Sequence, residues 1–272
     1  MQKLAFYGKG GIGKSTIAAG VSMALAQKGI RVLHVGCDPK HDSTMALVGD
    51  SKITTVIDKL FSVRAGSMTS ADLIMKGKQG IDCIESGGPE PGIGCGGRAV
   101  SRMFEILEQV GVLDDDHYDV AVFDVLGDVV CGGFAAPLRS AFAPKVVIVL
   151  SEEMAAAYAA NNIAQGVMRY LDNGACLAGV VMNLRDNQAD RKPVERFVEA
   201  IGTPILATIP RDHRMFEAEL EGRSIIEHAP RSKIAKMITD LAGLLLELKP
   251  EDCTAPRPLE FDALRKLMRG NR

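Results

Sequence analysis

The segment GKGGIGKST, residues 8–16, carries the residue types that hold the phosphates of a nucleotide. It follows an apolar run and opens a helix-forming stretch, which is the setting that a G-x-x-x-x-G-K-S/T phosphate-binding loop requires. Its glycines let backbone N–H groups converge on phosphate oxygens, and the helix start adds positive potential. We expect Lys14 to reach the β- and γ-phosphates and Ser15 to bind Mg²⁺. The residues expected to line the nucleotide are Gly8, Lys9, Gly10, Gly11, Ile12, Gly13, Lys14, Ser15 and Thr16.

Two aspartates that follow strand-like runs add carboxylates to the same site. Asp38, with Asp42 nearby, follows VLHVGC and is expected to act as a base or to position water. Asp124 ends VAVFD and is expected to hold Mg²⁺ directly or through water. An aspartate after a strand is common in α/β proteins, so this prediction depends on the combination with residues 8–16.

Two of the cysteines lie in glycine-rich loops after predicted strands. Cys95 stands in GIGCGGR and Cys131 in VVCGGF. Cluster sulfurs accept backbone N–H hydrogen bonds, and glycine lets the main chain approach them. The four others are expected to be ordinary structural residues: Cys37, Cys83, Cys176 and Cys253. No C-x-x-C pair is present, so we expect neither a zinc knuckle nor a ferredoxin-type cluster within one chain.

The cysteine count favours a shared cluster. A 4Fe–4S cluster needs four thiolates, and Cys95 with Cys131 supplies half of them. Two chains related by a two-fold axis complete the set and place the cluster on that axis. We therefore expect a homodimer with one cluster.

The elements that position these residues follow from hydrophobic periodicity. Near-continuous apolar strands alternate with amphipathic segments, which predicts a mostly parallel sheet with helices on both faces. The expected strands are 4–8, 32–36, 81–86, 120–125, 145–150, 177–183 and 204–210. The expected helices are 14–28, 98–110, 153–171, 190–201 and 232–247. We interpret residues 1–248 as one α/β P-loop domain and residues 249–272 as an extension of it.

Composition narrows the function classes. The net charge of −2 gives no general attraction to nucleic acid or anionic membrane. No apolar run approaches the ~18 residues of a membrane span, and the first residues do not form a secretory leader. We expect a cytoplasmic protein with neither a nucleic acid nor a membrane as partner.

Lys9 adds a second lysine near the start of the phosphate loop. The pattern K-G-G-x-G-K resembles the deviant Walker A loop of dimeric, SIMIBI-type ATPases, in which this lysine reaches the nucleotide of the other subunit. The alternative is a solvated loop charge. The resemblance implies a role for Lys9 in catalysis across a dimer interface.

Over nearly its whole length the chain resembles the nitrogenase iron protein family. The matching blocks are YGKGGIGKST, GCDPKHDST, ESGGPEPGIGCGGR, DVLGDVVCGGFAAPLR, EMAAAYAANNI and IPRDH. The resemblance implies a homodimeric, ATP-dependent reductase with a bridging 4Fe–4S cluster. Such a protein passes single electrons to a separate catalytic component and receives them from a ferredoxin or flavodoxin.

The resemblance also implies roles for particular residues. Cys95 and Cys131 would bind the cluster, and Asn183 would contact adenine. Lys40 and Asp128 fall in two switch segments, and Arg98 matches an arginine that is ADP-ribosylated in some nitrogenase reductases. The residues implied to serve nucleotide and Mg²⁺ are Lys9, Lys14, Ser15, Asp38 and Asp124, together with a later loop of Pro210, Arg211 and Asp212.

The branch of the family is less sharply indicated. CDPKHDST, with His41, and CGGFAAPL resemble the reductases of chlorophyll and nickel-tetrapyrrole synthesis. GGPEPGIGCGGR and YAANNI resemble the nitrogenase reductases, which we favour. A methylthio-alkane reductase component is a further alternative. Residues 50–80 match poorly and are expected to help define the partner.

One segment joins the two predicted sites. Asp124 and Cys131 are seven residues apart, about 25 Å of extended chain at most. Loss of the γ-phosphate is expected to shift this segment, as it does in switch loops, and so to change the surroundings of the cluster. Asp128 and Cys131 are the residues that we expect to couple the two sites.

Two other function classes remain open on the sequence alone. A positioning ATPase of the same loop type would use the C-terminal PLEFDALRKLMRGNR as a membrane-surface helix. The apolar residues of this segment form a stripe at helical spacing, and packing of the stripe on a partner subunit explains it equally well. The positioning-ATPase class also leaves Cys95 and Cys131 without a role. A cluster carrier is the other alternative, but such proteins usually use a C-x-x-C pair.

Overall fold

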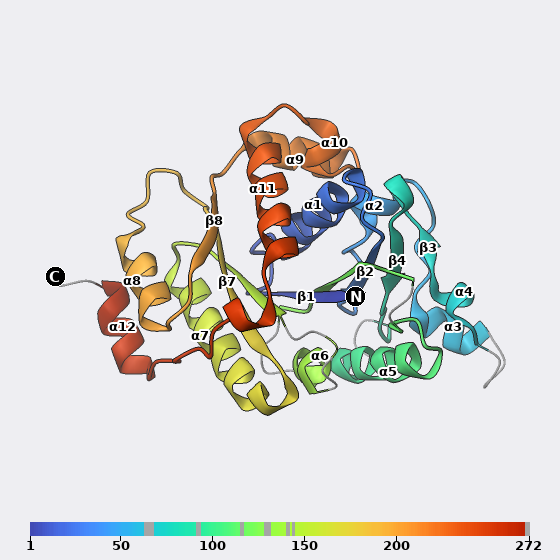
Figure 1. Ribbon diagram of the computed structural model, residues 1–272, viewed down its shortest axis with the longest axis horizontal. Helices are drawn as coiled ribbons and strands as arrows, with labels where there is room; N and C mark the ends of the chain where they lie inside the picture. The colour runs from blue at the N-terminus through green and yellow to red at the C-terminus, as the bar shows by residue number, and fades with distance from the viewer. Residues whose placement is uncertain are drawn as a thin grey trace.

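Strands placed side by side from distant parts of the chain form one sheet through the middle of the molecule (Figure 1). The computed structural model describes residues 1–62, 68–90, 94–114, 117–127, 132–139, 142 and 145–269. The strands are β1 (Gln2–Tyr7), β2 (Val32–Cys37), β3 (Met75–Lys76), β4 (Asp82–Glu85), β5 (Val120–Val125), β6 (Lys145–Leu150), β7 (Cys176–Asn183) and β8 (Ile205–Ile209).

The strand order is β3-β4-β2-β5-β1-β6-β7-β8. All neighbouring strands are parallel except β3, which pairs antiparallel with β4. The seven strands expected from the apolar runs are confirmed; β3, with two residues, carries too short a pattern to be recognised. Because parallel strands point the same way, the loops that follow β1, β2 and β5 open at one edge of the sheet.

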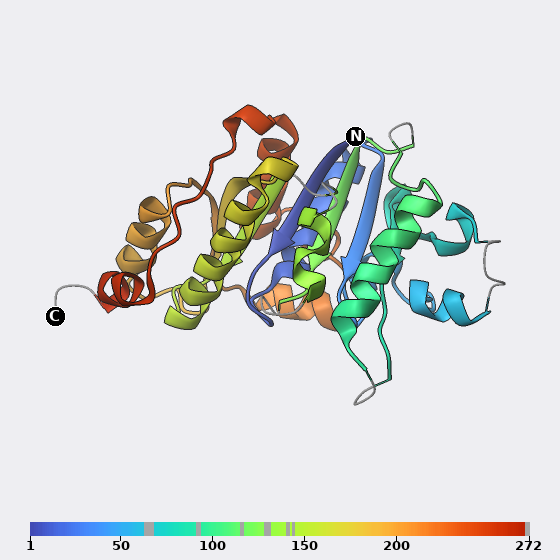
Figure 2. The same ribbon diagram turned by 90° about the horizontal axis from the view of Figure 1, so that it is seen from below.

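Helices cover both faces of this sheet (Figures 1 and 2). Helices α5, α6 and α7 lie along one face, and α1 and α11 pack together on the other. The five helices expected from the sequence are confirmed with ends within two residues: α1 (Lys14–Gln27), α5 (Gly96–Gln109), α7 (Met154–Arg169), α8 (Lys192–Ala200) and α11 (Lys233–Glu247).

Shorter helices join these elements. They are α2 (Met45–Val48), α3 (Val56–Ser62), α4 (Ser70–Leu73), α6 (Ala136–Arg139), α9 (His213–Leu220), α10 (Ile225–His228) and α12 (Phe261–Arg269), with 3₁₀ turns η1 (Lys78–Gly80), η2 (Gly132–Ala135), η3 (Leu171–Asn173) and η4 (Pro250–Asp252). Most have too few residues to show a helical period. The side chains of Ser224 and Asp212 cap α10 and α9 at their first turns.

The core contains one fully buried histidine. His34 on β2 lies between the hydroxyl groups of Ser22 on α1, at 2.8 Å, and Ser43, at 2.9 Å. Removal from water disfavours the imidazolium, so burial lowers the pKa of His34 to about 3. This neutral ring fastens the loop after β2 to the face of the sheet that α1 covers.

The C-terminal segment packs on its own chain. Leu177 on β7 and Thr254 exchange two backbone hydrogen bonds of 2.9 Å. The Asn161 amide holds both backbone groups of Leu259, at 2.8 and 2.7 Å. Helix α12 then rests on α7 and α8, with Leu264 wholly buried. Of the apolar residues that suggested a membrane-surface helix or a subunit contact, Leu264 therefore has its partner within the chain, while Phe261 stays 53% exposed with its ring edge-on to Tyr158.

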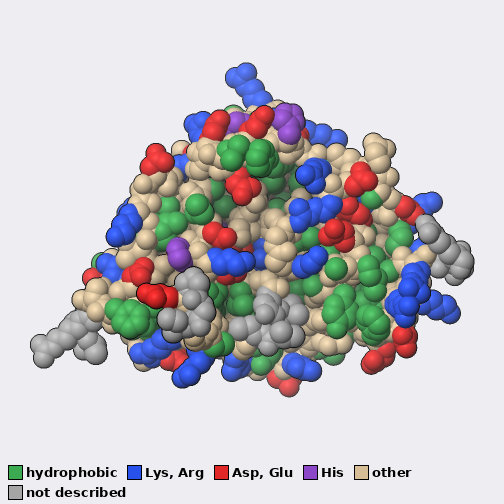
Figure 3. Space-filling view, turned by 180° about the vertical axis from the view of Figure 1, so that it is seen from behind, with side chains coloured by type: hydrophobic (Ala, Val, Ile, Leu, Met, Phe, Trp, Pro, Cys, Tyr) green, Lys and Arg blue, Asp and Glu red, His purple; other side chains and the backbone are tan. Residues whose placement is uncertain are grey.

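Charged side chains of both signs are interspersed over the face drawn in Figure 3. Among the described residues, no helix is both long and apolar enough to cross a bilayer.

Acid should weaken the fold through His34. The unfolded chain binds a proton near pH 6.5 and the folded chain does so only near pH 3, so the free energy of unfolding should fall as the pH drops through this window. The slope should be up to about 1.4 kcal/mol per pH unit for one histidine. Urea unfolding at a series of pH values tests this: His34→Gln should flatten the slope and the exposed control His117→Gln should not. Equal slopes in the wild type and His34→Gln would contradict the assignment.

Truncation of the α12 anchor should cost substantial stability. Leu264→Ala should lower the free energy of unfolding by about 2–5 kcal/mol because the methyl groups lost are fully buried. Arg265→Ala, the exposed neighbour, should change it by about 0.5 kcal/mol at most. Urea denaturation measures both, and similar small effects would mean that α12 does not rest on α7 and α8.

Candidate functional site

The phosphate loop connects β1 to α1 at the edge where the parallel strands end. Gly13, the residue before the helix, adopts φ 93°, a left-handed conformation that L side chains rarely adopt. A Cβ atom there would also lie 2.4 Å from the Asn183 amide nitrogen. That nitrogen donates to the Ile12 carbonyl at 2.8 Å. The loop is thus held from β7 in a shape that demands glycine.

Lys14 and Asp124 are buried near each other at this loop. Asp124 is the penultimate residue of β5, which lies next to β1, and it pairs with Phe6. Only 2% of its surface is exposed, and Lys14 is 7% exposed. Burial raises the pKa of Asp124, while the charge of Lys14 and hydrogen bonds from Ser15 and Ser43 oppose that shift. The sequence-predicted group of Lys14, Ser15 and Asp124 is therefore brought together.

One oxygen of this carboxylate is left without a protein partner. Asp124 Oδ1 is buried and accepts no hydrogen bond from the described residues. A buried, unpaired carboxylate oxygen is costly unless a cation or water satisfies it. A carboxylate beside a serine hydroxyl is the kind of oxygen donor set that Mg²⁺ prefers when it also binds phosphates. The residues present fit a Mg²⁺–nucleotide complex.

The loop after β2 carries Asp38 and Lys40. Asp38 is near enough for its charge to raise the pKa of Asp124, and its Oδ1 accepts the Lys40 N–H at 3.0 Å. The His41 N–H donates to the Asp38 carbonyl at 3.1 Å. Residues 38–41 therefore form a compact turn at the nucleotide edge, with Lys40 exposed.

A buried acid that the sequence analysis missed supports this loop. Glu85, the last residue of β4, is wholly buried, and its Oε1 accepts the Thr44 N–H at 2.7 Å. Burial raises the pKa of Glu85 to about 8 against the opposing hydrogen bonds from Thr44, with Asp124 adding to the rise. At neutral pH the protonated carboxyl therefore predominates. The sequence signal was an acid at the end of the apolar strand DCIE.

Arg185 is a second residue that the sequence analysis missed. Its guanidinium donates to the Gly11 carbonyl, and its backbone N–H donates to the Glu152 carboxylate. The phosphate loop is thus held by two residues that follow each other closely at the end of β7, Asn183 and Arg185. Nothing in the sequence around Arg185 marks it, because the contact joins residues 174 positions apart.

The later loop, Pro210 to Asp212, follows β8 at the same edge. Arg211 and Asn187 exchange two hydrogen bonds, at 2.8 and 2.9 Å. Asp212 caps α9 and binds the Arg214 guanidinium, which lowers the pKa of Asp212 to about 2. The loop reaches the phosphate loop through Arg185, whose carbonyl accepts from Arg211 at 3.3 Å. Asp212 is occupied within the chain, and its contact with nucleotide remains a prediction.

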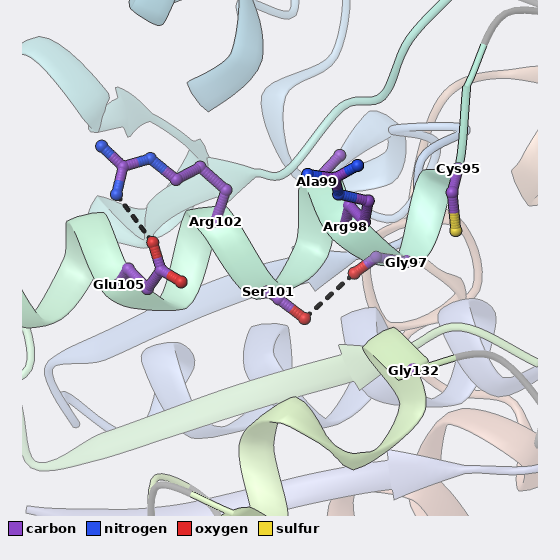
Figure 4. Close-up of a pocket in the computed structure, with 8 residues that line it drawn as sticks. All are labelled: Cys95, Gly97, Arg98, Ala99, Ser101, Arg102, Glu105 and Gly132. Carbon is purple, nitrogen blue, oxygen red and sulfur yellow. Dashed lines mark hydrogen bonds and ion pairs between the residues drawn. The ribbon is translucent and has the colours of Figure 1, made fainter.

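Cys95 lies at the start of α5, beside the other cysteine loop (Figure 4). It is exposed, and it lines one pocket with Gly97, Arg98 and Gly132. Gly132 directly follows Cys131, and a Cβ atom on the next residue, Gly133, would lie 2.9 Å from the Gly97 Cα atom. The two glycine-rich loops therefore touch.

Cys131 and Asp128 themselves lie outside the described residues. Among the residues that are described, no group of three or more His, Cys, Asp and Glu could hold a metal ion. The exposed Cys95 thiol and the first-turn N–H groups of α5 fit a cluster that sits at the surface of a chain. Arg98 is exposed beside them.

The other four cysteines lie away from this pocket. Cys37 and Cys83 are fully buried in β2 and β4. Cys176 and Cys253 are half-buried where the C-terminal segment crosses β7, and the Cys253 thiol donates to the Lys249 carbonyl at 3.6 Å. Their placement agrees with the structural roles expected for them.

The path between nucleotide and cysteine loops is tightly packed at both ends. A Cβ atom on Gly127 would lie 2.5 Å from the Gly10 nitrogen, so the chain after Asp124 runs directly against the phosphate loop. The buried Tyr7 hydroxyl donates to the Phe134 carbonyl at 3.1 Å, three residues beyond Cys131. The phosphate loop and the residue before it thus contact two described residues that flank positions 128–131, Gly127 and Phe134.

Solved structures share this architecture. The septum site-determining protein MinD of Pyrococcus horikoshii OT3, complexed with Mg-ADP, superposes with a TM-score of 0.70 at 23% identity, over 89% of this chain and 95% of that one. A ParA family ATPase from Chlorobium tepidum TLS gives 0.67 at 22% identity, over 89% and 97%. The α/β P-loop fold expected from the sequence is confirmed.

Sequence relatives identify the family. Residues 2–271 match the family model described as 4Fe-4S iron sulfur cluster binding proteins, NifH/frxC family. A nitrogenase iron protein of Methanospirillum hungatei JF-1 is 42% identical, over 99% of this chain and 96% of its own length. The nitrogenase iron protein of Methanococcus voltae is also 42% identical, over 98% and 95%. The chain belongs to the NifH/frxC family of 4Fe–4S iron–sulfur cluster binding proteins.

Proposed function

We propose that this protein is an ATP-dependent one-electron reductase. Two copies of the chain share one 4Fe–4S cluster, and MgATP hydrolysis is coupled to electron transfer to a separate catalytic component. Family membership supports the reaction class. The contacts of Gly127 and Gly133 carry the coupling, because they lie on the two sides of one short segment between the nucleotide and cysteine loops.

The nucleotide half rests on buried charge. Lys14 binds the β- and γ-phosphates, and Ser15 with Asp124 holds Mg²⁺. Asp38 positions the attacking water from the turn that begins at its carboxylate. Lys9 reaches the nucleotide of the partner chain, and Asn183, beside the phosphate loop, contacts the adenine. Their roles follow from the family pattern, and the proximity of Asp124, Lys14 and Ser15 supports the site as a whole.

The cluster half rests on the two cysteine loops. Cys95 and Cys131 of each chain hold the cluster, which when bound supplies one-electron redox chemistry. The first-turn N–H groups of α5, which follow Cys95 directly, would donate to sulfurs of a bound cluster and so tune its potential. Arg98, exposed beside Cys95, lies on the surface that meets the catalytic component, where ADP-ribosylation would block docking.

The coupling acts through backbone contact. Gly127 touches the phosphate loop at Gly10, so a change at the γ-phosphate moves the start of the 128–131 segment. Asp128 senses that change, and Lys40 responds in the other switch. At the far end, Gly133 rests on Gly97, so the same movement alters how the two cysteine loops meet. Hydrolysis thereby changes the surroundings of the cluster.

The proposed catalytic component is of the nitrogenase type. Two methanogen relatives at 42% identity carry that name. The alternative is the catalytic component of a nitrogenase-like enzyme, one that reduces a methylthio-alkane, a chlorophyllide or a nickel tetrapyrrole. The motif with His41 favours it. A ferredoxin or flavodoxin serves as electron donor.

The positioning-ATPase and cluster-carrier classes have less support. The MinD and ParA neighbours share the fold at 22–23% identity, which carries no function. Leu264 of α12 is buried where the helix rests on α7 and α8, which leaves less of its apolar surface for a membrane. Neither class uses the junction between Gly97 and Gly133.

Electron transfer should require Lys14. The reduced protein, mixed anaerobically with a nitrogenase catalytic component and MgATP, should lose its reduced-cluster EPR signal as electrons leave. Lys14→Ala should slow this loss by about 10²- to 10³-fold, because phosphate charge is no longer stabilised. Lys28→Ala, at the other end of the same helix, should behave as wild type.

The outcomes separate the candidates. ATP-dependent oxidation by a tetrapyrrole or methylthio-alkane reductase component, but not by the nitrogenase component, would reassign the partner. ATP hydrolysis by a protein that contains no iron after anaerobic purification would contradict the reductase function altogether.

A further inference from the structure

Pro39, in the turn of residues 38–41, contacts the loop that leads from β4 to Cys95, here called the Cys95 loop. It stands between Asp38 and Lys40 in the sequence, and it is half-buried. A Cβ atom on Gly96 would lie 2.4 Å from Pro39 Cγ, and one on Gly88 would lie 2.6 Å from Pro39 Cβ. Real Cβ atoms do not approach other atoms this closely, so the ring rests directly on the backbone of both glycines.

The two glycines lie on either side of Cys95 in the sequence. Gly96 is the next residue and the first of α5, and Gly88 lies at the beginning of the loop that leads from β4 to Cys95. Pro39 therefore touches this loop both where it leaves the sheet and where it enters the helix. A shift of the ring cannot leave both contacts unchanged, because close packing leaves no empty space between the ring and the two glycines.

The later residues of the loop after β2 are anchored by hydrogen bonds. Thr44 N–H is held by Glu85 at 2.7 Å, and the Ser43 hydroxyl by His34 at 2.9 Å. The strand bearing Glu85 is tied to β2, since Ser86 N–H donates to the Gly36 carbonyl at 2.9 Å. With residues 43 and 44 anchored, a nucleotide-dependent shift is expected in the turn of residues 38–41, which two hydrogen bonds to Asp38 hold together. Pro39 would then shift with Asp38.

We propose that Pro39 is a positioning residue that transmits the nucleotide state at Asp38 to the Cys95 loop, by a path separate from the 128–131 segment. The inference rests on the proposed function, since it takes Asp38 as the nucleotide sensor and Cys95 as a cluster ligand. Each cysteine loop then changes position in response to its own nucleotide-contacting segment. Pro39 acts on the Cys95 loop, and the chain after Asp124 acts on the Cys131 loop.

Hydrogen–deuterium exchange on the cluster-loaded protein tests this path without an activity readout. MgATP should change exchange in residues 8–16, 94–104 and 132–139 of the wild type. Pro39→Ala removes the ring atoms that touch Gly96, so the MgATP response of 94–104 should fall by about threefold or more. The responses of 8–16 and 132–139 should persist.

Pro89→Ala is the matched control. It makes the same chemical change in the Cys95 loop, where a Cβ atom on Gly94 would lie an ordinary 3.5 Å from Pro89 Cγ and no nucleotide residue takes part in that contact. Its MgATP response should match wild type. If Pro39→Ala weakens MgATP binding, Gly96→Ala serves as a second variant, because it changes the same contact from the Cys95 side and leaves Asp38 and Lys40 unaltered. It should also reduce the MgATP response of residues 94–104.

The results distinguish this inference from the proposed function. A wild-type protein without iron or without a MgATP response at 8–16 would contradict the proposed function. Iron and that response present, with an undiminished 94–104 response in both Pro39→Ala and Gly96→Ala, would overturn the Pro39 path alone.

Discussion

The burial of the Asp124 carboxylate beside Lys14 is the constraint on which the site depends. A carboxylate at 2% exposure, with one oxygen unpaired among the described residues, is costly to keep ionised. Lys14, Ser15 and Ser43 offset that cost in part, and Mg²⁺ on a nucleotide would offset the rest. The site is therefore built to be stabilised by its ligand, which gives the nucleotide a means of acting on the surrounding loops.

The parallel sheet turns this local constraint into a connection. Because β1, β2 and β5 point the same way, the phosphate loop, the turn at Asp38 and the chain after Asp124 all leave one edge. The strands also bring β4 beside β2, so the chain toward Cys95 starts next to the strand that leads to the turn at Asp38. Glu85 ties these two together from inside the sheet. Nucleotide and cysteine loops are neighbours by topology, although they are far apart in sequence.

The sequence predicts the parts of this arrangement that depend on local pattern. Residues 120–125 and 145–150 are near-continuous apolar runs, as expected for strands covered on both faces, and their ends were predicted to the residue. The phosphate loop is recognisable because its glycines and lysine act within nine residues. Glu85 and Arg185 were missed because their partners, Thr44 and Gly11, lie 41 and 174 positions away. The packing of Pro39 on two glycines is likewise a property of the fold.

The central claim is that two chains jointly hold one redox-active cluster, and the most direct test is iron stoichiometry with chain mass. Native mass spectrometry of anaerobically purified protein should give a dimer with one 4Fe–4S cluster, about two iron atoms per chain. Cys95→Ala should lose that iron while the exposed-site control Arg102→Ala keeps it. An iron-free dimer, or full iron content in Cys95→Ala, would contradict the account.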